Sequence, residues 1–205
     1  MQIEDMQKPG VALTEEDVRG FEQRNGLQLP APYRQFLLRC NGGTPPEGQG
    51  HFHAVIKRKN KPDAFISTAL TYFLTLDPAE EENLEWVFQQ TKEVKKLSAK
   101  YLLIGVSTAR FGFILLSLSK KTFGQVYLLN KDPYENKSTR YFLADDFPAF
   151  VRMLTSLEED KKIILELRRK SEEEMGWHPV VFKETEKALL PAERLPEIEG
   201  LVGSP

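Results

Sequence analysis

The stretch LPAPYRQFLLRCNGG, residues 29–43, places a short helix between two prolines and an Asn-Gly-Gly stop. Pro30 and Pro32 favour the start of a helix, because the first N–H groups of a helix have no partner inside it. An apolar stripe with helical spacing follows: Tyr33, Phe36, Leu37 and Cys40. Asn41–Gly43 then ends the helix and permits the positive φ angles of a sharp reversal. The stretch predicts a helix cut to length and a chain that turns back at once.

Helix signals continue on both sides of this stretch. Residues Thr14–Asp17 resemble a capping box, and Gly26 is a natural left-handed stop, so we expect a helix over about residues 15–25. Further along the chain, the pair Asp77-Pro78 predicts another helix, which keeps its apolar spacing to about Ser98.

Strand-like runs account for much of the remaining apolar sequence: 51–56, 65–76, 101–106, 111–118, 123–129 and the short 141–143. The connections between residues 101 and 129 are short enough for antiparallel hairpins. A last helix pattern starts at Asp146, and its spacing can continue through a charged segment as far as Gly176. These patterns predict an α+β fold in which N-terminal helices pack on a mainly antiparallel sheet, closed by a C-terminal helix.

The overall composition excludes several functional classes. The chain has 205 residues, a formal net charge of -2 and a pI of about 6.0, which provides no general basic surface for nucleic acid. Cys40 is the only cysteine, so an intrachain disulfide and a cysteine-based zinc site are excluded. We see no signal-peptide pattern and no apolar run of about 18 residues, so we expect a cytoplasmic protein without membrane contact.

Candidate catalytic and metal residues lack the context that their chemistry needs. Ser117–Lys120 matches the Ser-x-x-Lys pattern of penicillin-binding enzymes without its companion elements, and Ser107 precedes a strand where a nucleophile elbow needs a helix. His51 and His53 point to one face of a predicted strand, but a third metal ligand would have to come from elsewhere, such as His178. We therefore predict no catalytic, cofactor or metal site, and a serine hydrolase is the poorest alternative.

Ordered motifs run through residues 13–157. The first set is an acidic helix start, a Glu, Leu-Pro, a Tyr, a Phe-Leu pair, Asn-Gly-Gly and a nearby Pro: Thr14–Asp17, Glu22, Leu29, Pro30, Tyr33, Phe36, Leu37, Asn41, Gly42, Gly43 and Pro45. The second set is Ile104-Gly105, Gly112, Gly124–Tyr127 and Asp146–Leu154. In this order the chain resembles the SUKH superfamily of bacterial toxin-immunity proteins and fungal cell-wall assembly regulators. One departure is Val106–Arg110, which lacks the acidic residue that the family often has there.

The resemblance divides the chain into four parts: a loose N-terminus (1–12), a SUKH-like domain (13–157), a charged helical extension (158–176) and a Pro-rich extended tail (177–205). It implies a non-catalytic protein-binding domain without cofactors. The expected partner is a protein, in the first place a cognate toxin domain such as a nuclease, which the chain would bind and neutralise. The alternative is a regulatory scaffold or adaptor of the cell-wall assembly type.

Two charged clusters are candidates for partner contact. Glu81, Glu82 and Glu85 surround Trp86, and an acidic patch beside an aromatic anchor suits a basic partner. The same glutamates would also favour the helix dipole at the predicted helix start. Lys57–Lys61 is basic; it is either a solvated turn or an attractor of an acidic partner.

Overall fold

The computed structural model describes residues 1–81, 83–92, 100–108, 112–131 and 138–176 of the chain. Its N-terminal elements are a short 3-10 helix and two α-helices: η1 (Ile3–Asp5), α1 (Glu15–Asn25) and α2 (Ala31–Arg39). The central elements are β1 (His51–Ile56), β2 (Ala64–Phe73), α3 (Leu84–Lys92), β3 (Tyr101–Ser107), β4 (Gly112–Ser117), β5 (Val126–Lys131) and β6 (Ser138–Ala144). The last elements are α4 (Phe147–Met153) and α5 (Leu157–Glu174).

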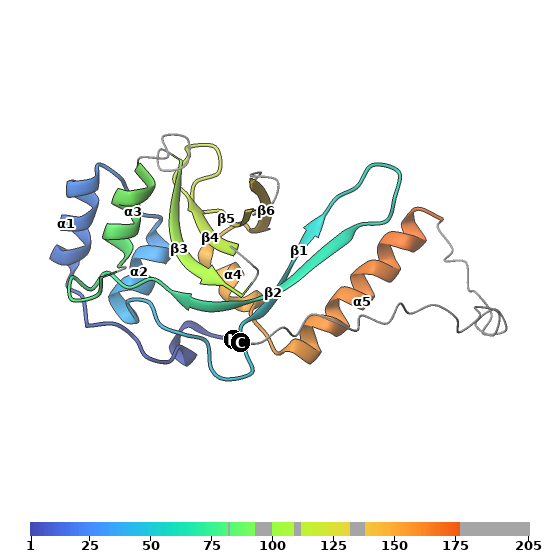
Figure 1. Cartoon of the computed structure of the whole chain (residues 1–205), viewed down its shortest axis with the longest axis horizontal. Helices are drawn as coiled ribbons and strands as arrows, with labels where there is room; N and C mark the ends of the chain where they lie inside the picture. The colour runs from blue at the N-terminus through green and yellow to red at the C-terminus, as the bar shows by residue number, and fades with distance from the viewer. Residues whose placement is uncertain (82, 93–99, 109–111, 132–137, 177–205) are drawn as a thin grey trace, which may run out of the picture.

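The six strands pair antiparallel in sequence order, so each strand lies beside the one before it. β2 is shared between two partners: residues 64–69 pair with β1, and residues 70–73 pair with β3. The β1–β2 hairpin therefore leaves the rest of the sheet and projects from the body of the molecule, with α5 packed along it (Figure 1). We call this hairpin together with α5 the arm. The helices and the antiparallel sheet confirm the predicted α+β fold.

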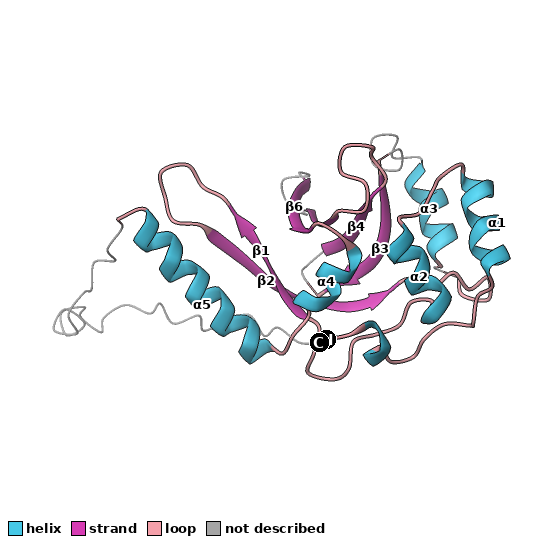
Figure 2. Cartoon of the chain, turned by 180° about the vertical axis from the view of Figure 1, so that it is seen from behind, coloured by secondary structure: helices cyan, strands magenta, loops and turns pink. Residues whose placement is uncertain are grey.

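Helices α1, α2 and α3 gather at the end of the molecule opposite the arm (Figure 2). The predicted capping box starts α1: Thr14 Oγ1 accepts a hydrogen bond from the Asp17 N–H at 3.2 Å, and the Thr14 N–H donates to Asp17 Oδ2 at 2.7 Å. Hydrogen bonds from the Thr14 hydroxyl and backbone lower the pKa of Asp17. Gly26 ends α1 at φ 62°, in the left-handed region.

Glu22 holds the turn between α1 and α2. Its Oε1 accepts a hydrogen bond from the Leu29 N–H at 2.8 Å, and its Oε2 lies 3.5 Å from Arg34 Nε. Pro30 then caps α2. The Glu and the Leu-Pro pair of the sequence motif thus meet in one contact that fixes how α2 leaves α1.

Aromatic rings from α2, β2 and α4 form the centre of the core. The Phe147 ring centroid lies 4.7 Å from that of Phe36 and 5.2 Å from that of Phe73. Tyr33 packs edge-on against Phe147 at 5.1 Å, and burial raises the pKa of its hydroxyl. Burying each of these side chains contributes on the order of 2 kcal/mol. Helix α4 therefore closes the core that α2 begins, as the sequence pattern at Asp146 predicts.

Asn41 is a buried polar junction at the end of α2. Its Nδ2 donates to the Val11 carbonyl at 2.9 Å, and its Oδ1 accepts from the Leu76 N–H at 2.6 Å. Its backbone adopts φ 46°, which Asn tolerates better than most residues. One side chain thus joins the N-terminal segment, the end of α2 and the segment after β2.

The two glycines that follow allow these segments to approach closely. A Cβ on Gly42 would lie 2.7 Å from Thr75 Cγ2, and a Cβ on Gly43 would lie 2.6 Å from the Gln7 carbonyl oxygen. Both glycines also have positive φ angles, 91° and 106°. The Asn-Gly-Gly motif therefore does more than end a helix, because the Thr75 side chain and neighbouring backbone occupy the space that side chains would need.

A third close approach lies between β2 and β3. Gly105 stands at a shift of register in β3, and a Cβ there would lie 2.9 Å from the Tyr72 carbonyl oxygen. Gly112 opens β4 opposite Ser107. Residues 102–104 of β3 are all buried, although neighbouring side chains of a strand point to opposite faces. The apolar run in the sequence correctly predicts a strand that is covered on both faces.

The chain interrupts the helix pattern of residues 146–176, which the sequence indicates could be continuous. Thr155 and His51 exchange two backbone hydrogen bonds, each 2.9 Å long, so the chain is extended at this point. Ser156 then caps α5 by accepting a hydrogen bond from the Glu159 N–H at 3.2 Å. The helix therefore ends as α4 and starts again as α5 in a new direction.

Residues 1–12, expected as a loose start, dock on the body of the domain. Gln7 and Thr44 exchange two backbone hydrogen bonds of 2.8 Å, and Met6 is buried. Backbone pairing of this kind leaves no periodic pattern in the sequence.

Strand boundaries also differ from those that the sequence predicts. Phe123, expected in a strand, lies exposed in the turn before β5, and β6 is longer than the short run that predicts it. Among the described helices, none combines the length and the apolar character that a bilayer crossing requires.

Candidate partner-binding site

An open groove of about 580 Å³ lies between the N-terminal segment, α1 and α3. Its apolar lining consists of Val11, Ala12, Leu13, Leu76, Pro78 and Trp86, and its polar lining consists of Asp17, Arg24, Asn83, Glu85 and Gln89. Trp86 and Val11 remain 46% and 52% exposed, so two large apolar side chains meet solvent at the groove. Exposed apolar side chains gathered in this way often mark a protein interaction site. We call this surface the Trp86 groove.

The segment before α3 fixes the position of Trp86. The sequence predicts a helix start at Asp77, but α3 begins at Leu84, and Asp77 instead accepts a hydrogen bond from the Ala79 N–H at 2.9 Å within a turn. Asn83 then caps the helix: its Oδ1 accepts from the Trp86 N–H at 2.8 Å, and its Nδ2 donates to the Asp77 carbonyl at 3.0 Å. Trp86 therefore stands on the first turn of α3 and is tied to the preceding turn through Asn83.

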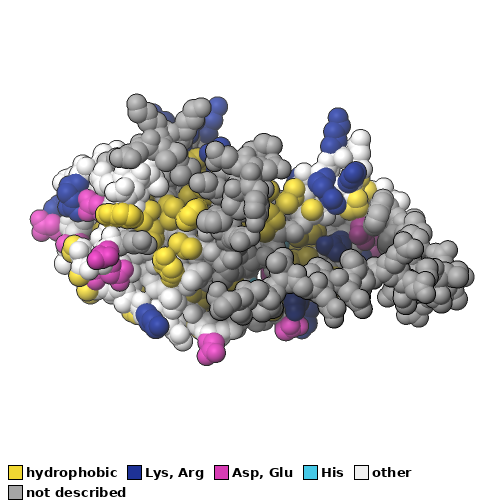
Figure 3. Space-filling model, in the orientation of Figure 1, with side chains coloured by type: hydrophobic (Ala, Val, Ile, Leu, Met, Phe, Trp, Pro, Cys, Tyr) yellow, Lys and Arg dark blue, Asp and Glu magenta, His cyan; other side chains and the backbone are white. Residues whose placement is uncertain are grey.

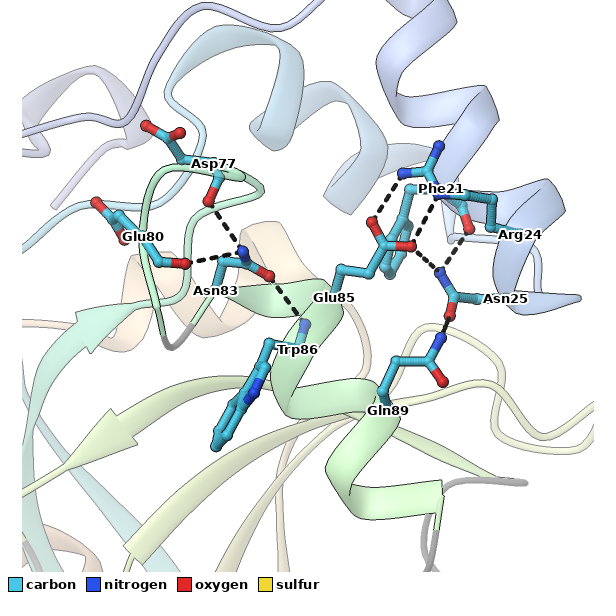
Figure 4. A network of polar contacts seen from close by, with 9 residues as sticks. All are labelled: Phe21, Arg24, Asn25, Asp77, Glu80, Asn83, Glu85, Trp86 and Gln89. Carbon is cyan, nitrogen blue, oxygen red and sulfur yellow. Dashed lines mark hydrogen bonds and ion pairs between the residues drawn. The ribbon is translucent and has the colours of Figure 1, made fainter.

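A network of polar contacts holds α3 against α1 (Figure 4). Arg24 donates from Nε and Nη2 to the two carboxylate oxygens of Glu85, at 2.9 and 2.7 Å, in the bidentate geometry that makes such pairs strong. This bond raises the pKa of Arg24. Asn25 donates to Glu85 Oε1 at 3.1 Å, and Gln89 donates to Asn25 Oδ1. The Trp86 indole points away from these four residues (Figure 4), and Trp86 is exposed to solvent.

The four predicted partner-binding residues have different surroundings. Glu81 is exposed in the turn before α3, and Glu82 lies outside the described residues. Glu85 is partly buried, and Arg24 neutralises its carboxylate, so the groove presents less negative charge than the sequence suggests. Trp86 is exposed at the groove. Contact of these residues with a partner stays a prediction.

Other residues line the groove without a signal in the sequence that would select them. Val11 belongs to the segment expected as loose. In the sequence, Arg24 and Gln89 occupy ordinary surface positions of two separate helices. They come together because α1 packs on α3, with the rings of Phe21 and Phe88 edge-on at 6.4 Å. That contact is tertiary, so an amphipathic pattern predicts each helix but not this pairing.

A second open hollow, of about 600 Å³, lies between α1, the start of α2 and the β4–β5 turn. Exposed Phe123 borders it. Two of its charged groups, Arg34 and Glu22, are engaged in the fold, because Arg34 pairs with both Glu22 and Glu15. The Trp86 groove is the stronger candidate, since two exposed apolar side chains meet there on a firmly held base.

Among the described residues, the hydrogen bonds of the two candidate serines include no base. Ser117 Oγ lies 2.7 Å from Thr122 Oγ1 and accepts a hydrogen bond from the Ser119 N–H at 3.3 Å, inside the β4–β5 turn. Ser107 Oγ is buried and has no hydrogen-bond partner in the part of the chain that the structure describes. A nucleophilic serine needs an adjacent base, and these contacts supply none to Ser117.

The histidines of β1 join the fold in another way. His53 Nδ1 lies 2.8 Å from Asp160 Oδ1, and Ser67 Oγ donates to Asp160 Oδ2 at 2.6 Å. The aspartate stands between the serine and the histidine, whereas a catalytic triad needs the histidine in the middle. Within the described ranges, no three His, Cys, Asp or Glu side chains gather as a metal site would require; His178 lies outside those ranges.

Comparison with known proteins agrees with the motifs. The model of the SMI1 / KNR4 family (SUKH-1) matches residues 12–153. No curated protein and no solved structure matches the chain. The matched region includes the Asn41–Gly43 junction and every lining residue of the Trp86 groove except Val11, and it ends before α5. Domains of this family serve in immunity and regulation and act through protein interactions. Since the match covers most of the chain, the protein belongs to the SMI1/KNR4 family (SUKH-1).

Proposed function

We propose that this protein is a cytoplasmic immunity protein that binds a cognate toxin domain and blocks its activity, without chemistry of its own. Membership of the SMI1/KNR4 family supports a role in protein binding. We choose the Trp86 groove as the binding surface because the indole of Trp86 is exposed, on a helix that two sets of polar contacts hold in place. The Trp86 groove is then the docking site.

The physical argument rests on preorganisation. Binding loses affinity when side chains and segments must be ordered on contact. Helix α3 is already fixed to α1 by the Arg24–Glu85 pair and to the preceding turn by Asn83. Tryptophan is enriched among the few residues that dominate binding energy. Exposed Glu81 lies in the turn that leads into α3, so an apolar anchor with basic neighbours, as on a nuclease, would match the site.

The first test concerns function. The full chain is co-expressed with the toxin domain encoded beside its gene. We expect a stable 1:1 complex by size-exclusion chromatography with light scattering, and loss of toxin activity. A toxin that stays fully active and unbound in the presence of excess protein would contradict the proposal.

The second part of this test concerns the surface. Trp86→Ala should weaken the complex by about 30-fold or more in isothermal titration, because a central tryptophan anchor contributes about 2 kcal/mol or more. Phe142→Ala is the matched control, since Phe142 is a similarly exposed aromatic residue on β6, away from the groove. Equal affinity of both variants and the wild type would place docking elsewhere while leaving the immunity function intact.

A regulatory scaffold is the second candidate, and the arm is the observation that favours it. Helix α5 lies beyond the family match and gives the chain an element outside the matched domain. A scaffold would bind envelope or signalling proteins, and its gene would have no toxin gene beside it. The gene neighbourhood therefore separates the two candidates.

A further inference from the structure

The arm carries its turn away from the body of the domain. β1 and β2 pair from His51–Ala69 to Ile56–Ala64, and β2 turns to β3 only from Leu70 onward. The turn at the free end, residues 57–63, consequently lies at the opposite end of the molecule from α1 and α3 (Figure 1). We call residues 57–61 the arm tip. A partner at the Trp86 groove would leave this tip accessible.

Helix α5 braces the arm along its length. Asp160 is fully buried and binds His53 on β1 and Ser67 on β2, which face each other in the register of the hairpin. Nearer the tip, the Asp63 N–H donates to Ser171 Oγ at 2.9 Å. The hairpin is thus held to α5 both in its middle and beside its turn. A β-hairpin without such support would be marginally stable.

The arm tip concentrates positive charge in a chain whose net charge is -2. Four of the five residues 57–61 are basic. Lys57 pairs with Asp63 at 2.6 Å, and Arg58 Nε donates to the Pro62 carbonyl at 2.6 Å. These bonds fix the turn, and no carboxylate of the described residues forms an ion pair with Arg58. Lys59 and Lys61 are exposed, and no carboxylate among the described residues lies within 4.0 Å of either. Figure 3 shows Lys and Arg side chains standing at this end of the molecule.

We propose that the arm tip is a second docking surface, which binds an acidic stretch of a partner polypeptide through Arg58, Lys59 and Lys61. The proposal stands independently of the function proposed above. Complementary charge steers association and selects partners, and a braced hairpin presents its cations without first having to be ordered.

An acidic polypeptide fits this surface better than nucleic acid does. Residues Glu172–Glu174 end α5 close to the tip, and the charge of Glu174 acts on Lys57. A duplex carries one phosphate charge per about 1.7 Å, so a backbone that followed the arm would meet these glutamates. The carboxylates of an acidic polypeptide stand on separate side chains, so they can contact the lysines of the arm tip without approaching these glutamates. The turn also has no aromatic side chain on which a single-stranded base could stack.

Fluorescence anisotropy with two labelled probes tests the proposal on the full chain. The probes are a poly-glutamate peptide of about 20 residues and a DNA duplex of about 20 base pairs, titrated at low and at near-physiological salt. We expect the wild type to bind poly-glutamate more tightly than DNA, with an affinity that falls as salt rises. The double variant Lys59→Gln/Lys61→Gln should bind the peptide about tenfold more weakly, since two exposed charge pairs are lost.

The matched control is Lys120→Gln/Lys121→Gln, which removes the same charge from two exposed lysines in the β4–β5 turn. This control should bind poly-glutamate like the wild type. Absence of peptide binding by the wild type, equal losses in the two variants, or tighter binding of the duplex would each overturn the proposal. Trp86→Ala should leave peptide binding unchanged, so the arm tip and the groove are tested separately.

Discussion

At the scale of single residues, Asn41 shows how a turn signal can also be a buried junction. The sequence predicts its place at the end of a helix, because Asn tolerates the left-handed backbone. It does not predict the bonds to Val11 and Leu76, whose positions lie 30 and 35 residues away. The same holds for Glu22, which is recognisable as part of a motif before its contact with the Leu29 N–H is known. Local backbone preference is encoded nearby, whereas hydrogen-bond partners depend on the complete fold.

The prediction at this scale concerns Asn41→Ala. The substitution leaves the Leu76 N–H and the Val11 carbonyl without their partner in a buried site, so the free energy of unfolding should fall by about 2–4 kcal/mol in urea denaturation. Asn60→Ala is the matched control, because Asn60 also has a left-handed backbone (φ 58°) but is exposed at the arm tip. It should lose only about 1 kcal/mol, the cost of that backbone conformation. Similar losses in both variants would mean that the side-chain bonds of Asn41 contribute little.

At the scale of elements, sequence signals succeed where a helix or strand is defined by its own residues. α1 has the predicted bounds because its capping box and its glycine stop are both local, and β1 has the predicted bounds as well. The start of α3 and the break before α5 are different. Asn83 replaces Asp77 as the cap once the preceding turn is folded, and Thr155 leaves the helix to pair with His51. Tertiary contacts override the local pattern at both points.

The prediction for elements concerns Asp160→Ala, which removes the acceptor shared by His53 and Ser67. Helix α5 should open more readily from the hairpin, so its amide hydrogens should exchange about 10- to 100-fold faster, as expected for a loss of about 1.5–3 kcal/mol. Amides of α1 and α2 should keep their exchange rates. Glu158→Ala serves as the control, since Glu158 is exposed and pairs only with Lys161 among the described residues. Unchanged exchange along α5 would show that apolar packing alone holds it.

At the scale of the whole molecule, contacts join segments that lie far apart in the chain. Phe147 of α4 contacts rings from α2 and β2, and the Met1 amino group donates to the Leu154 carbonyl at 3.3 Å. The sequence predicts that α4 closes the domain, because its apolar spacing is plain. It does not indicate which rings meet, and the same is true of the groove, whose walls come from three separate segments.

The prediction for the whole molecule concerns Phe147→Ala. Removal of a fully buried ring that touches several others should lower the free energy of unfolding by about 3–5 kcal/mol. Because the lost contacts span the core, far-UV and near-UV circular dichroism should report one shared, shifted transition. Phe142→Ala, at an exposed position, should change stability by less than about 1 kcal/mol. A Phe147→Ala variant as stable as this control would disprove the central role of the ring.

The late closure of the core has a consequence for biosynthesis. The Met1 amino group bonds to the Leu154 carbonyl, 153 positions later. The rings of α2 become enclosed only when Phe147 has been synthesised and packs against them. At a translation rate of about 5–20 residues per second, the nascent chain carries those rings unburied for on the order of ten seconds. Ribosome-associated chaperones are therefore expected to hold this chain until α4 emerges, and a message truncated before that helix should yield an aggregating product.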